Sequence, residues 1–273
     1  MTAESTRPSF SVVVPVRNVE RTITRTLESI IAQNGEAAEI IVIDGASTDS
    51  TLDKIKAYHP HLAAVVSEPD GGVYEAINKG LTQATGEIIA ILNGDDFYQH
   101  RDVFSLYAAH FNATDAGVLY GDLEFFLPSA PDEPIRRCCS SHFTRELLAY
   151  GWMPPHPTVF VRREIYDVVG RYDPSFEIAG DFEFLVRALA VRNVEARRVP
   201  SSVVRMQYGG LSTAGLRATY KLNKEIIRAC QMHGIKTNWL RLSQKVPRKL
   251  WEFRPLAQSF FRRVGSGVPH VKG

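Results

Sequence analysis

Residues 10–18, FSVVVPVRN, contain the apolar run on which the fold prediction depends. The run is rich in β-branched valine and is closed by Pro15, a pattern typical of a strand buried on both faces of a parallel sheet. After it, apolar side chains recur at helical spacing at Ile23, Leu27 and Ile30. The sequence therefore predicts a strand followed by a helix.

The same alternation continues over the first hundred residues. Strands are predicted at 39–43, 62–66 and 87–92, and helices at 51–58 and 73–84. A β/α series of this kind predicts an α/β fold with a mainly parallel central sheet flanked by helices. In such a sheet, ligands bind in the crevice outside the carboxyl ends of the strands.

The second half of the chain is less regular. Its patterns predict strands near 117–120 and 157–161 and an amphipathic helix at 182–192. A boundary is expected near residue 237, which separates a globular domain, 1–236, from a basic amphipathic C-terminal tail, 237–273.

Acidic side chains follow three of the predicted strands. Asp44 follows the second strand, Asp70 the third, and Asp95 and Asp96 the fourth. Because the carboxyl ends of parallel strands lie along one edge of a sheet, these carboxylates are expected to converge there. Aspartate also punctuates turns after strands, and for any single position that explanation remains open.

Composition and charge exclude several classes of protein. Apolar residues make up 44% and charged residues 23% of 273 residues, values of an ordinary globular chain. With 32 basic and 30 acidic residues the net charge is +2, which argues against a dedicated nucleic-acid binder.

The three cysteines have no disulfide or metal-site spacing, as is typical of a reducing compartment. With no signal peptide in residues 1–9, we expect a cytoplasmic protein, with any membrane contact at the inner face of the cytoplasmic membrane.

Four blocks, in this order and spacing, resemble the family 2 glycosyltransferases, which are inverting enzymes with a GT-A fold. They are VVVPVRN (12–18), VIDGASTD (42–49), DGGVYEAINKG (70–80) and LNGDD (92–96). The resemblance implies a GT-A catalytic domain over 1–236, with a nucleotide-binding half at 10–121 and an acceptor half at 122–236. It also implies a role in bacterial polysaccharide or glycolipid synthesis.

The resemblance assigns the donor nucleotide to residues at the sheet edge. Pro15, Arg17 and Glu20 would border the base and ribose. Asp44 would accept hydrogen bonds from the base or ribose, a role suited to an ionised carboxylate, which only accepts. Asp70 would contact the nucleotide. A turn or helix-capping aspartate is the alternative for Asp44.

The LNGDD block resembles the family's metal-binding motif. Asp95 matches the aspartate that holds a divalent cation, Mn²⁺ or Mg²⁺, against the diphosphate, and these ions accept one or two carboxylates with phosphate and water as further ligands. Asn93 replaces the first aspartate of the usual pattern, and Gly45 replaces an acidic residue that often follows the position of Asp44. Asn93 and Asp96 are expected next to the nucleotide, and a metal-independent site is the alternative.

Two further segments supply the expected chemistry. Asp181, in AGDFEF, occupies the position of the family's catalytic aspartate, the general base that takes the acceptor's proton. A helix N-cap is the alternative for Asp181, and Glu183 is a second candidate for the base. In PPHPTVF, His156 and Thr158 resemble the family's His-x-Thr stretch near the donor phosphates or the acceptor, although a structural histidine is almost as well supported.

The resemblance thus implies transfer of a sugar from a nucleotide-sugar, UDP-sugar by family frequency, to a hydroxyl of a glycan or lipid-linked acceptor. One alternative is a sugar nucleotidyltransferase, but residues 15–20 contain neither the glycine nor the lysine typical of its first loop. The other is a non-catalytic nucleotide- or glycan-binding module. Retention of Asp95, Asp96 and Asp181 together argues against it. The sequence leaves the oligomeric state open.

The tail interleaves aromatic with basic residues, a composition that suits an anionic membrane surface. A C-terminal helix packed on the domain explains the same pattern equally well. The basic residues are Arg241, Lys245, Arg248, Lys249, Arg254, Arg262 and Arg263.

Overall fold

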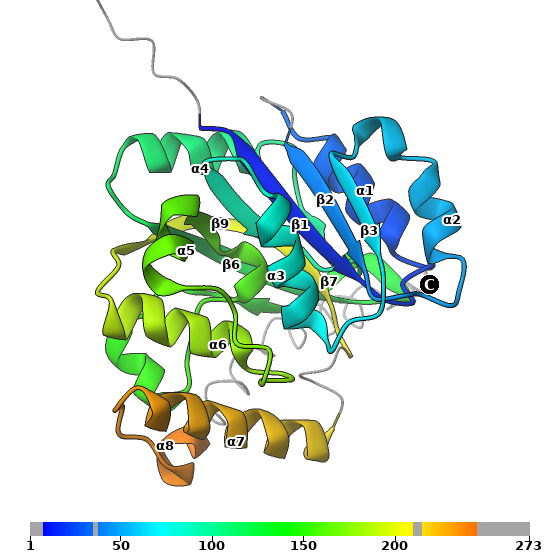
Figure 1. Ribbon diagram of the computed structural model, residues 1–273. Helices are drawn as coiled ribbons and strands as arrows, with labels where there is room; N and C mark the ends of the chain where they lie inside the picture. The colour runs from blue at the N-terminus through cyan, green and yellow to red at the C-terminus, as the bar shows by residue number, and fades with distance from the viewer. Residues whose placement is uncertain (1–7, 35–37, 210–214, 245–273) are drawn as a thin grey trace, which may run out of the picture.

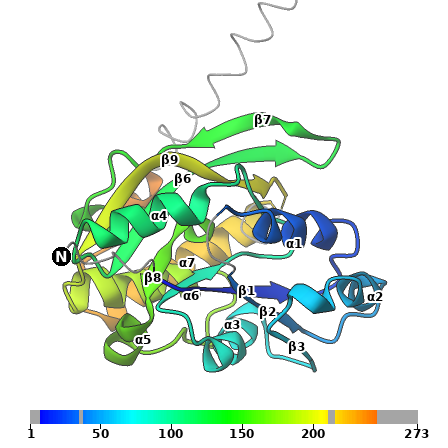
Figure 2. The same ribbon diagram turned by 90° about the horizontal axis from the view of Figure 1, so that it is seen from above.

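A computed structural model describes residues 8–34, 38–209 and 215–244 (Figure 1). Within these residues the chain forms one mixed sheet with helices on both faces (Figure 2). The order of the strands is β3-β2-β1-β4-β8-β6-β9-β5, and β7 pairs with β6. The strands are β1 (Phe10–Val16), β2 (Glu39–Asp44), β3 (Ala64–Ser67), β4 (Ile88–Ile91), β5 (Phe97–Tyr98), β6 (Val118–Leu127), β7 (Ala130–Cys138), β8 (Phe160–Arg162) and β9 (Ala196–Gln207).

Helices cover the sheet on its two sides. On one side lie α1 (Ile23–Ile31) and α4 (Val103–Asn112), and on the other lie α3 (Val73–Gln83), α5 (Arg163–Val169) and α6 (Gly180–Leu185) (Figure 2). The short α2 (Thr51–Lys56) follows β2. Beyond α6 the chain continues through a π-helical segment, η4 (Val186–Val191), and later through α7 (Leu216–Met232) and α8 (Trp239–Ser243).

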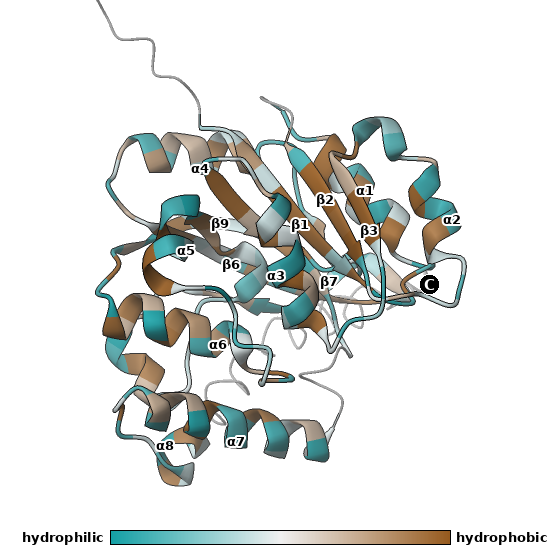
Figure 3. Cartoon of the chain, in the orientation of Figure 1, coloured by the Kyte–Doolittle hydropathy of each residue, from teal (hydrophilic) through white to brown (hydrophobic). Residues whose placement is uncertain are grey.

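The parallel half of the predicted sheet is confirmed. Strands β3, β2, β1 and β4 are neighbours and all pair in parallel, with Val12 of β1 opposite both Ile40 and Ala90. Every residue of β1 is buried because helices cover both faces. Figure 3 shows the apolar strands lying between the helices. The parallel arrangement brings the carboxyl ends of β1, β2, β3 and β4 to one edge.

The second half of the sheet mixes directions. β8 runs antiparallel to both β4 and β6, whereas β6 and β9 are parallel. The strand predicted at 157–161 begins later, at Phe160, and residues 156–158 form a 3₁₀ turn, η3 (His156–Thr158). Pro157 lacks the backbone N–H that a central strand must donate, which explains the shift. The helix predicted at 182–192 begins at Gly180 and continues as the π-helical segment η4.

Two buried clusters hold the layers together. One joins the sheet to α3, α6 and α7, and the other joins it to α1 and α4. At Gly80 of α3 an added Cβ would collide with the side chain of Val13 in β1. Glycine is therefore required for the close approach of α3 to the sheet, and that approach fixes the start of α3 at the sheet edge.

The described part of the tail packs on the domain. The hydroxyl of Thr237 donates to the carbonyl oxygen of Ala149 at 2.6 Å, and Leu242 of α8 is buried in the cluster with α3 and α6. Residues 245–273, which carry most of the predicted membrane-facing side chains, lie outside the described residues. Of the helices in the described ranges, none combines the length and apolar character that crossing a bilayer requires.

Candidate active site

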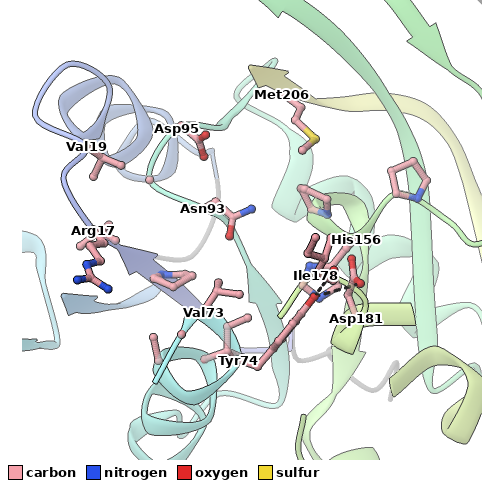
Figure 4. A pocket seen from close by; sticks show the side chains of 18 of the residues that line it. Arg17, Val19, Val73, Tyr74, Asn93, Asp95, His156, Ile178, Asp181 and Met206 are labelled. Atoms are coloured by element: carbon pink, nitrogen blue, oxygen red, sulfur yellow. Dashed lines mark hydrogen bonds between the residues drawn. The ribbon is translucent and has the colours of Figure 1, made fainter. Parts of the chain in front are cut away.

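A cavity of about 710 Å³ lies at the edge where the carboxyl ends of the parallel strands meet (Figure 4). Its lining comes from the ends of β1 and β4, the start of α3, and several segments of the second half of the chain. The predicted site residues that line it are Pro15, Arg17, Asp70, Asn93, Asp95, His156 and Asp181. Side chains from distant stretches of sequence thus share one cleft. Glu20, Asp44, Asp96 and Thr158 are not among the lining residues.

Asp44 lies behind the cavity wall rather than on it. Its side chain is fully buried. The carboxylate accepts hydrogen bonds from the amide of Ser47 at 3.0 Å, from the Ser47 hydroxyl, and from the Ser67 hydroxyl at 2.6 Å. These bonds fix the loop after β2 to the end of β3. The predicted contact of Asp44 with the base stays a prediction.

The absence of a side chain at Gly45 leaves room for the carboxylate of Asp70. A Cβ at residue 45 would lie 2.5 Å from Oδ2 of Asp70, so the carboxylate of Asp70 occupies the space next to Gly45. Oδ1 of Asp70 accepts a hydrogen bond from the amide of Gly72 at 3.0 Å. Gly72 has φ 135°, a conformation that favours glycine, and it is the N-cap of α3. The space next to residue 45 therefore holds the carboxylate of Asp70, whereas the motif described above usually has an acidic residue at position 45 itself.

The loop after β1 is tied to the loop after β2. Oδ1 of Asn18 accepts from the amide of Thr48 at 2.8 Å, and Oε2 of Glu20 accepts from the amide of Ser50 at 3.1 Å. Glu20 therefore points to the start of α2 and away from the cavity. Arg17, exposed at the mouth of the cavity, is the charged side chain of this loop that lines it.

The side chains of Asp95 and Asp96 differ in direction: that of Asp95 lines the cavity, and that of Asp96 is buried. Burial raises the pKa of the Asp95 carboxyl, which lines the cavity. The pKa of Asp96 is raised well above its ordinary value by complete burial and then by the charge of Asp95. Asp96 accepts from the amide of Gln207 at 3.3 Å and from the side-chain amide of Asn93 at 3.4 Å. Asp96 therefore anchors the loop, and Asp95 faces the cavity.

A divalent cation would suit Asp95, because burial destabilises the charged form of its carboxylate and a hard cation prefers oxygen ligands. Within the described residues, no three His, Cys, Asp or Glu side chains gather closely enough to hold a metal ion alone. The donor set fits a cation held by Asp95 together with phosphate oxygens of a ligand.

Asp181 is the second residue of α6, whose N-cap is Ala179, so it does not fill the N-cap position considered for it. Its Oδ1 accepts from the amide of Phe182 at 2.7 Å and from the Tyr74 hydroxyl at 3.3 Å. Burial raises the pKa of Asp181, although the nearby His156 acts in the opposite direction. A carboxylate with a raised pKa is a stronger base than an exposed aspartate.

Glu183, the second candidate base, points elsewhere. It is buried and paired with Arg187 at 2.6 Å and with Nε2 of His233 at 2.8 Å, and it does not line the cavity. Its carboxylate connects α6 to α7. Of the two acidic residues in this helix, Asp181 is therefore the one that faces the cavity.

His156 lines the cavity, and Thr158 stabilises the turn that contains His156. Burial lowers the pKa of the His156 imidazole, although the charge of Asp181 acts in the opposite direction, and Nε2 lies 3.0 Å from the hydroxyl of Tyr172. The Thr158 hydroxyl is buried and donates to the carbonyl oxygen of Pro155 at 2.8 Å. Thr158 thus holds the turn that presents His156.

Sequence reasoning missed several lining residues. Tyr74 lies inside the DGGVYEAINKG block, so the motif itself could have pointed to it. Phe125, Cys138 and Met206 come from strands of the second half, where no local pattern indicated that they would reach the site.

Comparison with known proteins identifies the family of the chain. The family model described as glycosyl transferase family 2 matches residues 11–167. A PGL/p-HBAD biosynthesis glycosyltransferase of Mycobacterium bovis is 28% identical over 75% of this chain and 79% of its own. An uncharacterised glycosyltransferase of Mycobacterium tuberculosis is 31% identical over 67% of this chain and 70% of its own.

Solved structures of similar fold carry nucleotide-sugars. The S. aureus TarS structure in complex with UDP-GlcNAc has a TM-score of 0.63 and 21% identity, covering 84% of this chain and 68% of TarS. The mannosyltransferase PcManGT of Pyrobaculum calidifontis, in complex with GDP-Man and Mn²⁺, has a TM-score of 0.64 and 20% identity, covering 97% of this chain and 78% of its own. At these identities the likeness shows the fold. The motifs, the GT-A fold and the family match together show that this chain is an enzyme belonging to glycosyl transferase family 2.

Proposed function

We propose that this glycosyltransferase transfers a sugar from a UDP-sugar to an acceptor hydroxyl with inversion at the anomeric carbon. The observation that carries the proposal is that Asp95, Asp70 and Arg17 line the same cavity as the half-buried carboxylate of Asp181. A donor-binding end and a proton acceptor therefore share one cleft. Structural relatives that bind UDP-GlcNAc, or GDP-Man and Mn²⁺, support the nucleotide-sugar as donor.

The donor would lie along the sheet edge. Pro15 and Arg17, which line the cavity, would border the base and ribose, and Asp70, which lines it just before α3, would contact the nucleotide. Asp95 would hold a Mn²⁺ or Mg²⁺ ion, with Asn93 next to the diphosphate. When bound, the cation would neutralise the charge of the leaving nucleoside diphosphate.

The transfer step uses Asp181. Its carboxylate takes the proton of the acceptor hydroxyl while that oxygen forms a bond to the anomeric carbon. The bond from this carbon to the diphosphate oxygen breaks at the same time, and its electron pair leaves with the nucleoside diphosphate. Attack from the face opposite the leaving group inverts the configuration. His156, which lines the same cavity as Asp181, would hydrogen-bond the acceptor or the donor phosphate.

A donor screen tests this function. The full chain is incubated with a panel of UDP-, GDP- and dTDP-sugars, a glycoside acceptor mixture and Mn²⁺ or Mg²⁺, and both free nucleotide and glycoside product are measured. We expect release of UDP matched by a product whose new linkage has the opposite anomeric configuration by NMR. Donor binding without turnover would instead indicate a binding module. Diphosphate release from a nucleoside triphosphate and a sugar phosphate would indicate a nucleotidyltransferase.

We also propose that the chain acts in cell-surface polysaccharide or glycolipid synthesis on the inner face of the cytoplasmic membrane. Residues 10–121 would bind the nucleotide and 122–236 the acceptor. The basic residues of the tail support membrane contact through charge. Leu242 packs in the core cluster, so that contact would involve the exposed Trp239 and Leu240 of α8 together with the basic residues from 245 onward.

A further inference from the structure

The cavity has two chemically different walls. One wall, at the ends of β1 and β4 and before α3, carries the charged and polar side chains among its apolar ones, and we call it the polar wall; its polar residues are Arg17, Asp70, Asn93 and Asp95. The other wall comes from β6, β7, β9 and the segment before η3. We call it the apolar wall, and it consists of Leu123, Phe125, Cys138, Met153 and Met206. Figure 4 shows Met206 across the cavity from Arg17.

The apolar wall is built by strand register. Leu123 of β6 is opposite Cys138 of β7, and Phe125 of β6 is opposite Met206 of β9. Directly opposite residues share a face of the sheet, as do residues two apart on a strand, so these four side chains form one surface. Phe125, Cys138 and Met206 pack against the buried core, yet they remain partly exposed on the cavity side.

Polar groups are few on this side of the cavity. Apart from the thiol of Cys138, the ionisable side chains that line the cavity from the second half of the chain are those of His156, Glu177 and Asp181. His156 already contacts Tyr172, and Asp181 contacts Tyr74. A group covered with hydroxyls would lose hydrogen bonds to water against the apolar wall without replacing them, and that loss is costly.

We propose that the apolar wall binds an aromatic ring carried by the acceptor, next to the hydroxyl that receives the sugar. This inference deepens the proposed function and depends on it, because it assumes that Asp181 activates that hydroxyl. Cys138, Met153 and Met206 carry sulfur, which makes favourable contacts with aromatic rings, and the flexible thioethers adapt to a ring's outline. The guanidinium of Arg136 lies over the ring of Phe125, 5.0 Å from its centroid, and Tyr208 packs edge-on at 6.2 Å, so the part of the ring that lines the cavity is what a bound ring would contact.

Matched acceptors test the inference. Phenyl and methyl glycosides of the same sugar, taken over a small panel of sugars, are compared with the full chain. We expect the phenyl glycoside to have a KM about tenfold lower, the size of a single well-packed ring contact. In saturation-transfer NMR, the phenyl protons should receive more saturation than the sugar protons. Met206→Gln, which keeps the length of the side chain, should raise the phenyl KM towards that of the methyl glycoside.

The matched control is Leu127→Gln, an exposed position on β6 outside the cavity, which should leave the preference unchanged. Equal KM values for the two glycosides with the unmodified chain would overturn the inference while leaving the transferase function intact. A phenyl preference that survives Met206→Gln and Phe125→Ala would also overturn it. If no donor is turned over with any acceptor, the proposed function fails. Binding of the phenyl glycoside is then measured by itself, and its loss in Met206→Gln would show that the apolar wall binds the ring.

Discussion

The hydroxyl oxygen of Tyr74 lies 3.3 Å from Oδ1 of Asp181, and the same oxygen lies 2.7 Å from the carbonyl oxygen of Ile178. A phenol has one hydrogen, so Tyr74 can donate to only one of these acceptors at a time. When it donates to Ile178, a protonated Asp181 can donate back to the phenol oxygen. The Tyr74 hydroxyl can therefore donate a hydrogen bond to Asp181 while the carboxylate is ionised, and can accept one from Asp181 after the carboxylate has taken a proton.

Tyr74→Phe is expected to move the pH dependence of transfer. The Tyr74 hydrogen bond lowers the pKa of Asp181, so its loss raises that pKa. Transfer requires the ionised carboxylate, so kcat falls as the pH drops through the pKa of Asp181. The acid limb of the kcat profile should therefore shift to higher pH, with kcat at the optimum about tenfold lower and an unchanged donor KM.

Tyr98→Phe is the control for this prediction. Tyr98 is a buried tyrosine of the other core cluster, and its hydroxyl has no hydrogen-bond partner among the described residues. Its variant should keep the wild-type pH profile. Coinciding profiles for Tyr74→Phe and the wild type would show that Tyr74 is only a packing residue.

Asp181→Asn should abolish transfer while the protein stays folded. Loss of a general base costs about 10²- to 10⁴-fold in kcat, and the donor Kd, measured by calorimetry, should stay near that of the wild type. Because folding raises the pKa of Asp181, its ionised form lowers stability as the pH rises through that folded pKa. At pH 7 the Tm of Asp181→Asn should therefore equal or exceed that of the wild type. Substantial residual transfer would rule out Asp181 as the base.

The part of the site that lies at the carboxyl ends of the parallel strands could be predicted from the sequence, because those strand ends share one edge of the sheet. Asp70 and Asp95 follow parallel strands and do line one cavity, and Asp44 ends at the same edge. Local loop geometry decides which of these carboxylates faces the cavity. Asp44 turns inward to Ser47, and Asp96 turns to Asn93, and neither turn is encoded in strand periodicity.

The apolar wall was not predicted because it depends on pairings between distant strands. β6 pairs in parallel with β9, about eighty residues later in the chain. β7 contains Pro131 and Pro134, which are unusual inside a strand and hide its pattern. Which side chains such pairings bring to the cavity follows only from the tertiary structure.

Gly45→Ala is expected to weaken donor binding without unfolding the protein. The added Cβ would lie 2.5 Å from Oδ2 of Asp70, so the carboxylate must rotate away from the sheet edge. Rotation of a short side chain costs little stability, whereas loss of its contact with the donor should raise the donor Kd about tenfold. A double-mutant cycle with Asp70→Ala checks the cause. Independent, additive effects of the two substitutions would contradict it.

Asp95→Ala should weaken donor binding and the response to metal together. If Asp95 holds the cation against the diphosphate, Mn²⁺ will improve the donor Kd in the wild type but not in the variant, and the variant Kd in Mn²⁺ should be at least about tenfold higher. Asp53→Ala is the control, because Asp53 is exposed on α2 and pairs with Lys56 at 2.7 Å. An undiminished Mn²⁺ effect in Asp95→Ala would assign the cation to another site.

Truncation tests the proposed role of the tail, and the structure decides where to cut. A cut after Thr237 would remove Leu242, which is buried in the core cluster, and would therefore destabilise the domain. A cut after Gln244 removes only residues 245–273. This variant should keep its Tm and its activity on water-soluble acceptors, while binding to vesicles of anionic lipid falls and loses its salt dependence. Glutamine in place of Lys245, Arg248 and Lys249 should reduce vesicle binding in the same direction. Vesicle binding that persists after the cut would place the membrane contact on α8, with its exposed Trp239 and Leu240, or on the domain, and would contradict a role for residues 245–273.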